Sequence, residues 1–329
     1  MRRSVPRFLL APLLLAAAAS ASAQPAGSVS LYGLLDLSVG RSQALGGVAT
    51  KGVDSGKMTT SYWGVKGSED LGGGMSAVFA LESFMRSDTG APGRFNADTM
   101  WARNAYVGLG GKAGQLTLGR NTTSLFVQTL MFNAFGDSFG FSPAIRQYFS
   151  SNTVSGDTGW SDSIRYLSPR FGGTSFSLHG ALGEANGGRN LGASVNHAAG
   201  PLAVAGAWQR VDKGAAVDDT TTWQLAGSYD FGPAKLFGQY GRVKNRTAAT
   251  TPTFTVTGLG ASIAAGSTGK VLVQYGRLSP ETGAATTTFT AGYDHFLSKR
   301  TDVYAAWMNE RRSGTSAANS YGLGVRHRF

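Results

Sequence analysis

The chain has 329 residues, 47 glycines, no cysteine and a formal net charge of +11. The lack of cysteine excludes disulfide frameworks, thiolate metal sites and thiol nucleophiles. The basic residues are scattered along the chain without a Lys/Arg tract, so the positive excess indicates anions as partners and predicts no contact with nucleic acid.

The first 23 residues have the three parts of a secretory signal peptide. Arg2, Arg3 and Arg7 form a positive segment, residues 8–19 are apolar, and the small residues 21–23 form a cleavage site. The apolar run is too short for a spanning helix, and a proline interrupts it. We therefore expect residues 1–23 to be removed and residues 24–329 to form one exported domain with a net charge of +8.

The mature sequence alternates between apolar and polar residues, with a period of two. From Val29 to Val39 the odd positions are mostly leucine or valine and most even positions are polar, and a similar pattern recurs between Trp223 and Phe231. This period is typical of β-strands with two different faces. No later stretch has the ~18 consecutive apolar residues that a spanning helix needs.

Tight turns separate these segments at regular intervals. Seven glycine-rich or polar turns alternate with eight longer polar connections, which predicts sixteen strands. The turns lie at residues 72–74, 110–112, 172–173, 199–201, 232–233, 266–269 and 298–300. Short turns at one edge and long loops at the other are typical of an outer-membrane barrel, so we predict an all-β fold, a sixteen-stranded antiparallel transmembrane β-barrel.

The last nine residues also predict a membrane barrel. Residues 321–329 alternate and end on an aromatic residue, as expected for a strand that closes against the first strand. Tyr321 and Phe329 should face lipid, whereas Arg326 and Arg328 should face inward. A soluble β-sandwich would show the same alternation, but aromatic residues near the ends of many strands favour the barrel. These residues are Trp63, Tyr106, Trp208, Trp223, Trp307 and Phe329.

One connection is much longer than the others. About forty residues separate the strand that ends near Arg120 from the strand that begins near Asp162, far more than an unstructured loop normally has. The loop is rich in phenylalanine and has few acids, among them Asp137 and Asp157. Because such a loop would be a poor surface to leave in water, we expect it to fold into the barrel and narrow it.

Several short motifs follow one another along the whole mature chain. They are SLYG at 30–33, WGVKGSEDLG at 63–72, AVFALE at 77–82, RNAYVGL at 103–109, LGR at 118–120, SIRY at 163–166, LSKRT at 297–301 and RHRF at 326–329. Each motif is loose alone, but in this order the chain resembles the trimeric general porins of Gram-negative outer membranes, in their beta-proteobacterial branch.

The resemblance implies a homotrimer of barrels in the cell outer membrane, surrounded by outer-membrane lipid, each barrel with its own pore narrowed by the third loop. Arg103, Arg165 and Glu82 match the family's constriction residues, whereas Tyr62 replaces an arginine that the family usually has. With Asp137 from the loop, these residues form the predicted constriction. The residues predicted to line the rest of the pore are Lys66, Asp36, Arg326 and Arg328.

Strand alternation predicts which way the arginine of the RNAYVGL motif points. If Tyr106 and Gly108 face lipid, then Arg103, Ala105 and Val107 face inward. A guanidinium group keeps its charge at any relevant pH, so inward arginines would raise the local concentration of anions. We therefore expect a water-filled diffusion channel for small hydrophilic solutes, with a mild anion preference.

Two alternatives remain open from the sequence. The aromatic loop and Tyr62 are also compatible with a substrate-selective channel for small organic anions. A barrel hydrolase would need a paired serine and histidine. The segment 136–140 matches Gly-x-Ser-x-Gly, but no apolar strand precedes it and no histidine is obviously paired with it. The four histidines lack metal-ligand spacing, so we expect neither an enzyme nor a cofactor or metal site.

Overall fold

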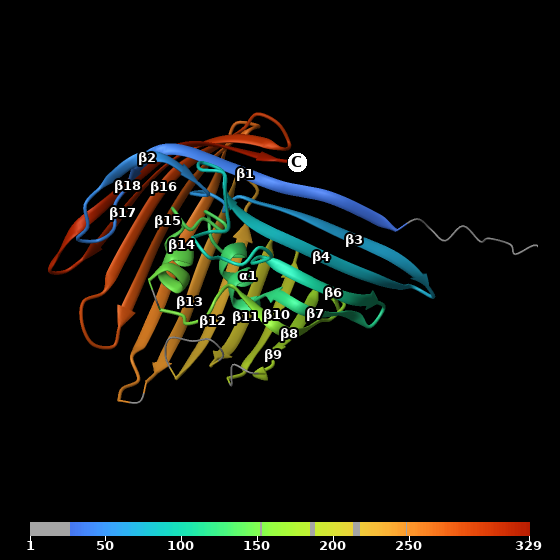
Figure 1. Cartoon of the computed structure of the whole chain (residues 1–329). Coiled ribbons are helices and arrows are strands. Elements are labelled where there is room, and N and C mark those ends of the chain that lie inside the picture. Colours follow the sequence, from blue (N-terminus) through green and yellow to red (C-terminus); the bar gives the residue numbers. More distant parts are fainter. Residues whose placement is uncertain (1–26, 152, 185–187, 213–217, 248) are drawn as a thin grey trace, which may run out of the picture.

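The computed structural model describes residues 27–151, 153–184, 188–212, 218–247 and 249–329, and the predicted signal peptide lies outside these ranges. The strands form one closed antiparallel sheet that surrounds the helices of the long loop (Figure 1). Sixteen long strands make the wall, so the predicted barrel is confirmed. Of the two shorter strands, β2 pairs with the second half of β1, and β5 lies within the connection between β4 and β6.

The elements have the following bounds. They are β1 (Ser28–Ser42), β2 (Thr50–Ser55), β3 (Tyr62–Gly72), β4 (Met75–Arg86), β5 (Ala91–Pro92), β6 (Asn104–Gly111), β7 (Gly114–Thr122), α1 (Ser124–Met131), α2 (Pro143–Ile145), η1 (Arg146–Ser150), β8 (Gly159–Leu167), β9 (Thr174–Ala181), β10 (Asn190–Ala199), β11 (Leu202–Val211), β12 (Asp219–Asp230), β13 (Ala234–Arg246), β14 (Thr253–Ala265), β15 (Gly269–Pro280), β16 (Thr286–Phe296), β17 (Thr301–Arg312) and β18 (Thr315–Arg328).

The first and last strands close the barrel. β1 pairs antiparallel with β18, and Leu37 lies opposite Val325. The backbone of the terminal residue completes the pairing, because Phe329 and Gly33 exchange two N–H···O hydrogen bonds of 3.1 Å. Seven short turns lie at one end of the barrel, which we call the turn end, and seven longer connections lie at the other end, the loop end. The prediction of an eighth long connection is wrong, because only residues 313–314 separate β17 from β18.

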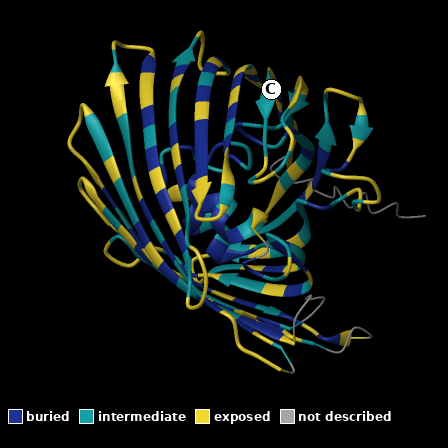
Figure 2. Ribbon diagram, turned by 90° about the vertical axis from the view of Figure 1, so that its left-hand side faces the viewer, coloured by how far each residue is buried: buried dark blue, intermediate teal, exposed yellow. Residues whose placement is uncertain are grey.

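The two faces of the wall follow the predicted alternation. On β1, Leu31 and Val39 point outward with 65% and 58% of their surface exposed, whereas Asp36 and Ser38 between them are buried inside. The strands are banded by burial along their length (Figure 2). Among the described residues, no helix is long and apolar enough to cross a membrane.

The second strand of the wall is interrupted. β1 pairs with β3 through its first half and with β2 through its second half, so β2 and β3 are two pieces of one strand. Between them, residues 56–61 leave the wall and enter the interior. The departure begins at Gly56, whose φ of +74° suits glycine, and its N–H donates to the Asp36 carbonyl at 2.9 Å.

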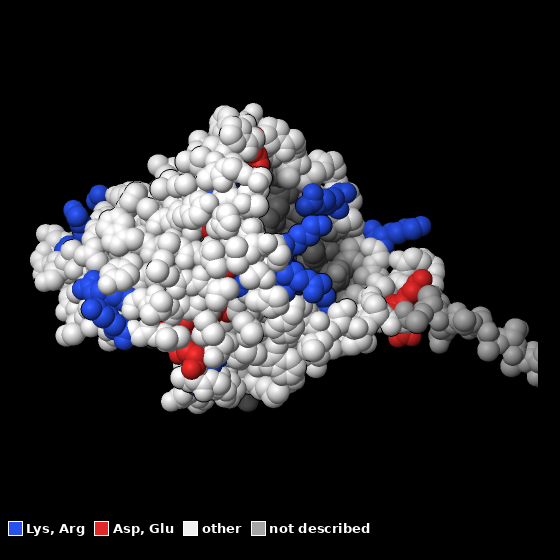
Figure 3. Space-filling model, turned by 90° about the horizontal axis from the view of Figure 1, so that it is seen from above, with Lys and Arg blue, Asp and Glu red and all other residues white. Residues whose placement is uncertain are grey.

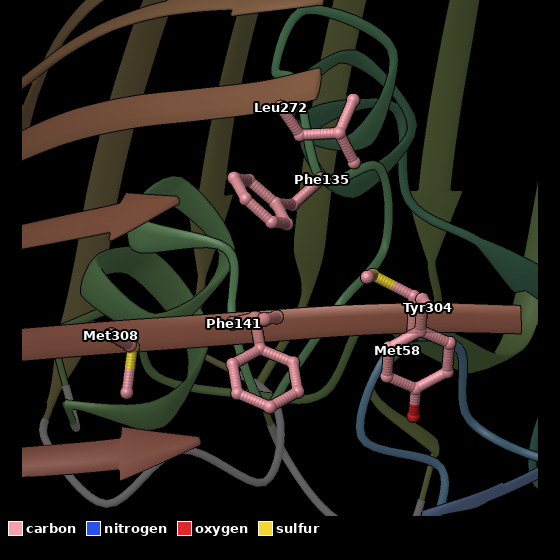
Figure 4. Packing of buried hydrophobic residues seen from close by; sticks show 7 residues of the cluster. Met58, Phe135, Phe141, Leu272, Tyr304 and Met308 are labelled. Carbon is pink, nitrogen blue, oxygen red and sulfur yellow. The ribbon is translucent and has the colours of Figure 1, made fainter. Parts of the chain in front are cut away.

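The long loop is folded and packed inside the barrel. α1 begins at a Thr123 cap that accepts the Phe126 N–H at 3.3 Å, and Ser142 caps α2 in the same way. Phe135 and Phe141 pack against Leu272 and Tyr304 of the wall and Met58 of the interrupted strand (Figure 4). Burial of each such side chain contributes about 1.5–3 kcal/mol, which holds the loop against the wall.

Candidate functional site

Two chain segments narrow the interior, and we call them the constriction loops: residues 56–61 and residues 123–158. They are joined by hydrogen bonds. The Lys57 carbonyl accepts from Ser138 Oγ at 2.7 Å and from the Gly140 N–H at 3.0 Å. The Thr59 hydroxyl donates to Asp137 Oδ1 at 3.1 Å. The constriction is therefore built from two parts of the chain that lie far apart in the sequence.

The constriction loops separate two cavities. The cavity toward the turn end has a volume of about 610 Å³ and is lined by Tyr62, Arg103, Asp137, Lys235 and Lys270 among others. The cavity toward the loop end has a volume of about 630 Å³. Its lining includes the basic residues Lys57, Arg86, Arg94 and Arg146.

Asp36 holds the shorter constriction loop in place. Its Oδ2 accepts the N–H groups of Met58 and Thr59 at 2.7 and 2.8 Å, and its Oδ1 accepts the Tyr304 hydroxyl at 2.8 Å. Asp36 is fully buried. The prediction that Asp36 lines the pore is therefore wrong, because the segment that it caps covers it.

Glu82 and Arg103 form an ion pair beside Tyr62. Arg103 Nη1 lies 2.6 Å from Glu82 Oε1, and the guanidinium carbon lies 4.0 Å from the centre of the Tyr62 ring. Tyr32 and Asn104 also donate to the Glu82 carboxylate. The structure thus brings Glu82, Arg103 and Tyr62 into contact, and Asp137 lines the same cavity. The charge of Arg103 is balanced by Glu82.

The prediction that Tyr106 faces lipid and Val107 faces inward is wrong. Val107 and Leu109 point outward with 59% and 49% of their surface exposed, so Asn104 and Tyr106 are on the inward face. Arg103 still reaches the interior. It precedes the first residue of β6, so the alternation of that strand does not determine which way its side chain points. Its N–H donates to the Glu82 carbonyl at 3.3 Å.

Arg165 lies on the inward face of β8, next to the outward Ile164. Its Nε donates to Ser177 Oγ at 3.4 Å, and in the strand register it is opposite His179. The His179 ring is buried and stacked on Trp160 with 4.6 Å between ring centres. Among the described residues, no carboxylate lies within ion-pair distance of Arg165.

The arginines of the last strand are paired with acids of neighbouring strands. Arg326 contacts Asp294 at 2.6 Å and Asp302 at 2.7 Å, and Arg328 contacts Asp302 at 2.8 Å. Arg326 is buried, so it mainly ties β16, β17 and β18 together. Lys66 lies 4.5 Å from the centre of the Tyr32 ring and has no ion pair within the described part of the chain.

Several interior residues were not found from the sequence. Lys235 and Lys270 line the turn-end cavity, where their ammonium groups lie 5.5 and 5.4 Å from the rings of Phe237 and Phe296. Their inward parity, shared with Phe237 and Leu272, was the signal that could have identified them. The Arg146–Glu310 pair, at 2.7 Å, links the long loop to β17.

An ion network anchors the end of the long loop. Arg94 contacts Asp98 at 2.8 Å and Asp157 at 2.7 Å, and Arg120 also pairs with Asp157. Burial by itself would raise the pKa of Asp157, but the hydrogen bonds and charge of Arg94, with the charge of Arg120, outweigh burial and lower it. The network therefore keeps Asp157 ionised.

The Gly-x-Ser-x-Gly segment has a structural role. Ser138 is fully buried, and its Oγ donates to the Lys57 carbonyl and accepts the Phe141 N–H at 2.9 Å. The hydroxyl is thus used to join the two constriction loops. In the described ranges, no group of three His, Cys, Asp or Glu side chains could hold a metal ion.

The comparisons with known proteins agree with this architecture. A family model described as Gram-negative porin matches residues 10–315. Outer membrane porin protein 32 of Delftia acidovorans is 30% identical over 335 residues, which cover 96% of this chain and 93% of that protein.

Two solved structures of outer-membrane channels share the fold of this chain. An anion-selective porin from Comamonas acidovorans superposes with a TM-score of 0.82 at 26% identity, covering 92% of this chain and all of that one. The trimer form of OmpT from Vibrio cholerae, at 16% identity and a TM-score of 0.69, covers 92% of this chain and 100% of that chain and shares the fold.

Proposed function

Because the chain belongs to the Gram-negative porin family and is a diffusion channel of the outer membrane, we propose that small hydrophilic solutes pass through it with a mild preference for anions. One observation supports this preference. Arg165, Lys66, Lys235 and Lys270 point inward without a carboxylate in ion-pair distance among the described residues. Figure 3 shows lysine and arginine side chains beside a hollow in the molecular surface.

The preference is mild because most interior carboxylates lie near arginines, and their negative charges cancel the positive charges. Glu82 binds Arg103, and Asp302 binds Arg326 and Arg328. Two unit charges ~8 Å apart in water-like surroundings interact by only about 0.5 kcal/mol, so a few unpaired cations bias permeation by small factors. Tyr62, in the place of a third arginine, adds no charge.

The proposal is tested by the reversal potential of the purified protein in a planar bilayer under a salt gradient. The parent protein should show a modest anion preference. The double variant Arg103→Gln/Arg165→Gln should shift the reversal potential toward zero or toward cations, with a larger shift at low salt, because salt screens the charges.

A matched control and two contrary results make the test decisive. Lys112→Gln/Arg170→Gln removes two exposed charges from turns and should leave the reversal potential unchanged. An unchanged reversal potential in the Arg103→Gln/Arg165→Gln variant would remove the assignment of these residues to the constriction. Cation preference in the parent protein would do the same.

We also propose that the chain assembles as a homotrimer. The support is family membership and a related fold solved in a trimer form. We expect the protein to migrate at trimer size in an unheated gel and at monomer size after heating. Monomer mass in mild detergent by native mass spectrometry would contradict the assembly.

A substrate-selective channel for small organic anions is the second candidate. Lys235 near Phe237 and Lys270 near Phe296 give the turn-end cavity both positive charge and aromatic surface. Saturation of the conductance by one carboxylate, with no saturation by chloride, would favour this candidate. No catalysis is proposed for either, and purified protein should not hydrolyse lipid esters.

A further inference from the structure

The outer wall carries an apolar groove that the channel function does not use. It spans β10 to β14 on the outward face, with a volume of about 780 Å³. Val204, Leu225 and Leu259 are among its walls. Its floor includes Gly227 and Gly238, which are directly opposite each other in the strand register.

The backbone does not require glycine at these floor positions. Neither Gly227 nor Gly238 has a positive φ. A methyl group would meet its nearest heavy atom at 3.7 Å at Gly227 and at 3.8 Å at Gly238, which is ordinary contact. Because glycine weakens a strand and often marks close approach of another molecule, we attribute these two to the groove itself.

Positive side chains stand at the loop-end side of the groove. Gly238, Tyr240, Arg242 and Lys244 follow one another on the outward face of β13, so Arg242 lies about 13 Å along the strand from the groove floor. Arg277 of β15 is opposite Thr257, which lines the groove. The groove therefore runs from an apolar floor to a cationic end.

The cations at this end are largely uncompensated. Arg242 contacts Glu281 at 3.6 Å, but both side chains are more than 40% exposed. Lys244 and Arg277 form no ion pair within the described ranges. Arg277 Nε donates to Ser279 Oγ at 3.0 Å. Guanidinium and ammonium groups beside hydroxyls have the donor chemistry that binds phosphate oxygens.

We propose that this face binds a phosphorylated acyl lipid of the outer leaflet. The acyl chain lies in the groove over Gly227 and Gly238, and the phosphate contacts Arg242, Lys244 and Arg277. The orientation follows from the fold, because the long loops of such barrels face outside and the cations lie toward the loop end. A cationic cluster beside an apolar surface is complementary to an anionic lipid headgroup.

Native mass spectrometry of the full-length mature protein in mild detergent tests the proposal with two matched ligands. Lipid A carries phosphates, and dephosphorylated lipid A keeps the same acyl chains without them. Lipid A should bind about tenfold more tightly, because each cation near an anionic lipid strengthens binding about fivefold and neighbouring effects are not fully additive. Equal binding of the two ligands would overturn the proposal.

Two variants separate the headgroup from the acyl chain. Arg242→Gln/Arg277→Gln should reduce lipid A binding most of the way to the level of the dephosphorylated ligand, because only Lys244 remains to contact the phosphate. Gly238→Leu fills the floor of the groove and should weaken the binding of both ligands. Lys299→Gln/Arg300→Gln, in an exposed turn at the other end, is the charge-matched control and should bind like the parent.

Two further measurements separate lipid binding from folding and from assembly. All variants should keep the conductance of the parent protein. Unchanged conductance would show that the barrel is intact, by a measurement that does not depend on lipid binding. If Gly238→Leu changed only the oligomeric state and left lipid A binding unchanged, the groove would be a contact between subunits and the proposal would be wrong.

Discussion

Arg103 has less influence on passing ions than its position suggests. It lines the turn-end cavity beside the constriction loops, but the Glu82 carboxylate is 2.6 Å away and cancels most of its field. A charged pair of this kind attracts anions and cations almost equally at a distance. The selectivity of the constriction therefore depends on whether the pair is intact.

Glu82→Gln should increase the anion preference. The substitution removes the negative charge and leaves Arg103 unbalanced, and a unit charge ~8 Å from a passing ion changes its energy by about 0.5 kcal/mol in water-like surroundings. Because the anion gains this energy and the cation loses it, the ratio of anion to cation permeability should rise about fivefold, measured from the reversal potential at low salt.

Arg103→Gln is the mirror-image variant, because it leaves Glu82 unbalanced. The two variants should move the reversal potential in opposite directions from the parent value. Shifts in the same direction would show that the pair acts through pore size and not through charge.

Single residues were predictable where a motif marked them and were less predictable where local geometry decided. Glu82, Arg103 and Arg165 were identified by their motifs, but their pairing was not. The alternation of β6 could not place Arg103, because Arg103 precedes the strand. Asp36 lies on the inward face of β1, as predicted. The alternation along the strand cannot reveal that residues 56–61 cover it.

At the level of elements, the long loop depends on charges at its ends. Asp157 is held by Arg94 and Arg120, and Arg94 also binds Asp98. Within this network the pKa of Asp98 is lowered too, because the hydrogen bonds to Arg94 outweigh the effect of burial. These carboxylates therefore stay ionised in moderately acidic solution and keep the loop attached.

Asp157→Asn should loosen the end of the long loop at neutral pH. The variant keeps the shape of the side chain but removes the charge that binds both arginines. Single-channel recordings should show more frequent brief closures than in the parent. Thr158→Ala, a neighbouring change that leaves the ion pairs in place, should not have this effect.

The parent protein should acquire the same behaviour in acid. Because the folded-state pKa of Asp157 is lowered, its stabilising contribution is complete above the unfolded value of about 3.9 and is lost as the pH falls from there through the lower folded value. Closures that increase on raising the pH from neutral would contradict the ion network as their cause.

Most elements were predictable because turns and alternation are local signals. The seven turns located the strands, and the phenylalanine-rich loop was expected to fold inward. The interruption at 56–61 was not expected, since its sequence resembles an ordinary polar connection. It becomes visible only when β1 is seen to pair with both β2 and β3.

At the scale of the whole molecule, closure of the barrel depends on a crowded position. A Cβ at Gly33 would lie 2.6 Å from the Tyr62 carbonyl oxygen and 2.6 Å from the Phe329 ring. Gly33→Ala should therefore lower barrel stability by about 1–3 kcal/mol, the usual cost of overpacking. The loss should appear as a lower temperature for conversion to the unfolded form on a gel.

Gly52→Ala is the matched control, because a Cβ there meets no atom within 4 Å. Both variants replace glycine by alanine in strands that pair with β1 or belong to it. Equal stability of the two variants would show that the closure at Gly33 can adjust to the added methyl group.

The hydrogen bonds between the constriction loops have a consequence for the exchange of parts among related channels. Lys57 bonds to Ser138 and Gly140, and Thr59 bonds to Asp137, so the aperture is shaped jointly by residues 56–61 and by the long loop. A chimera that received only the long loop of another channel would keep half of its old aperture. The permeability of the donor should be transferred only when both segments are exchanged together.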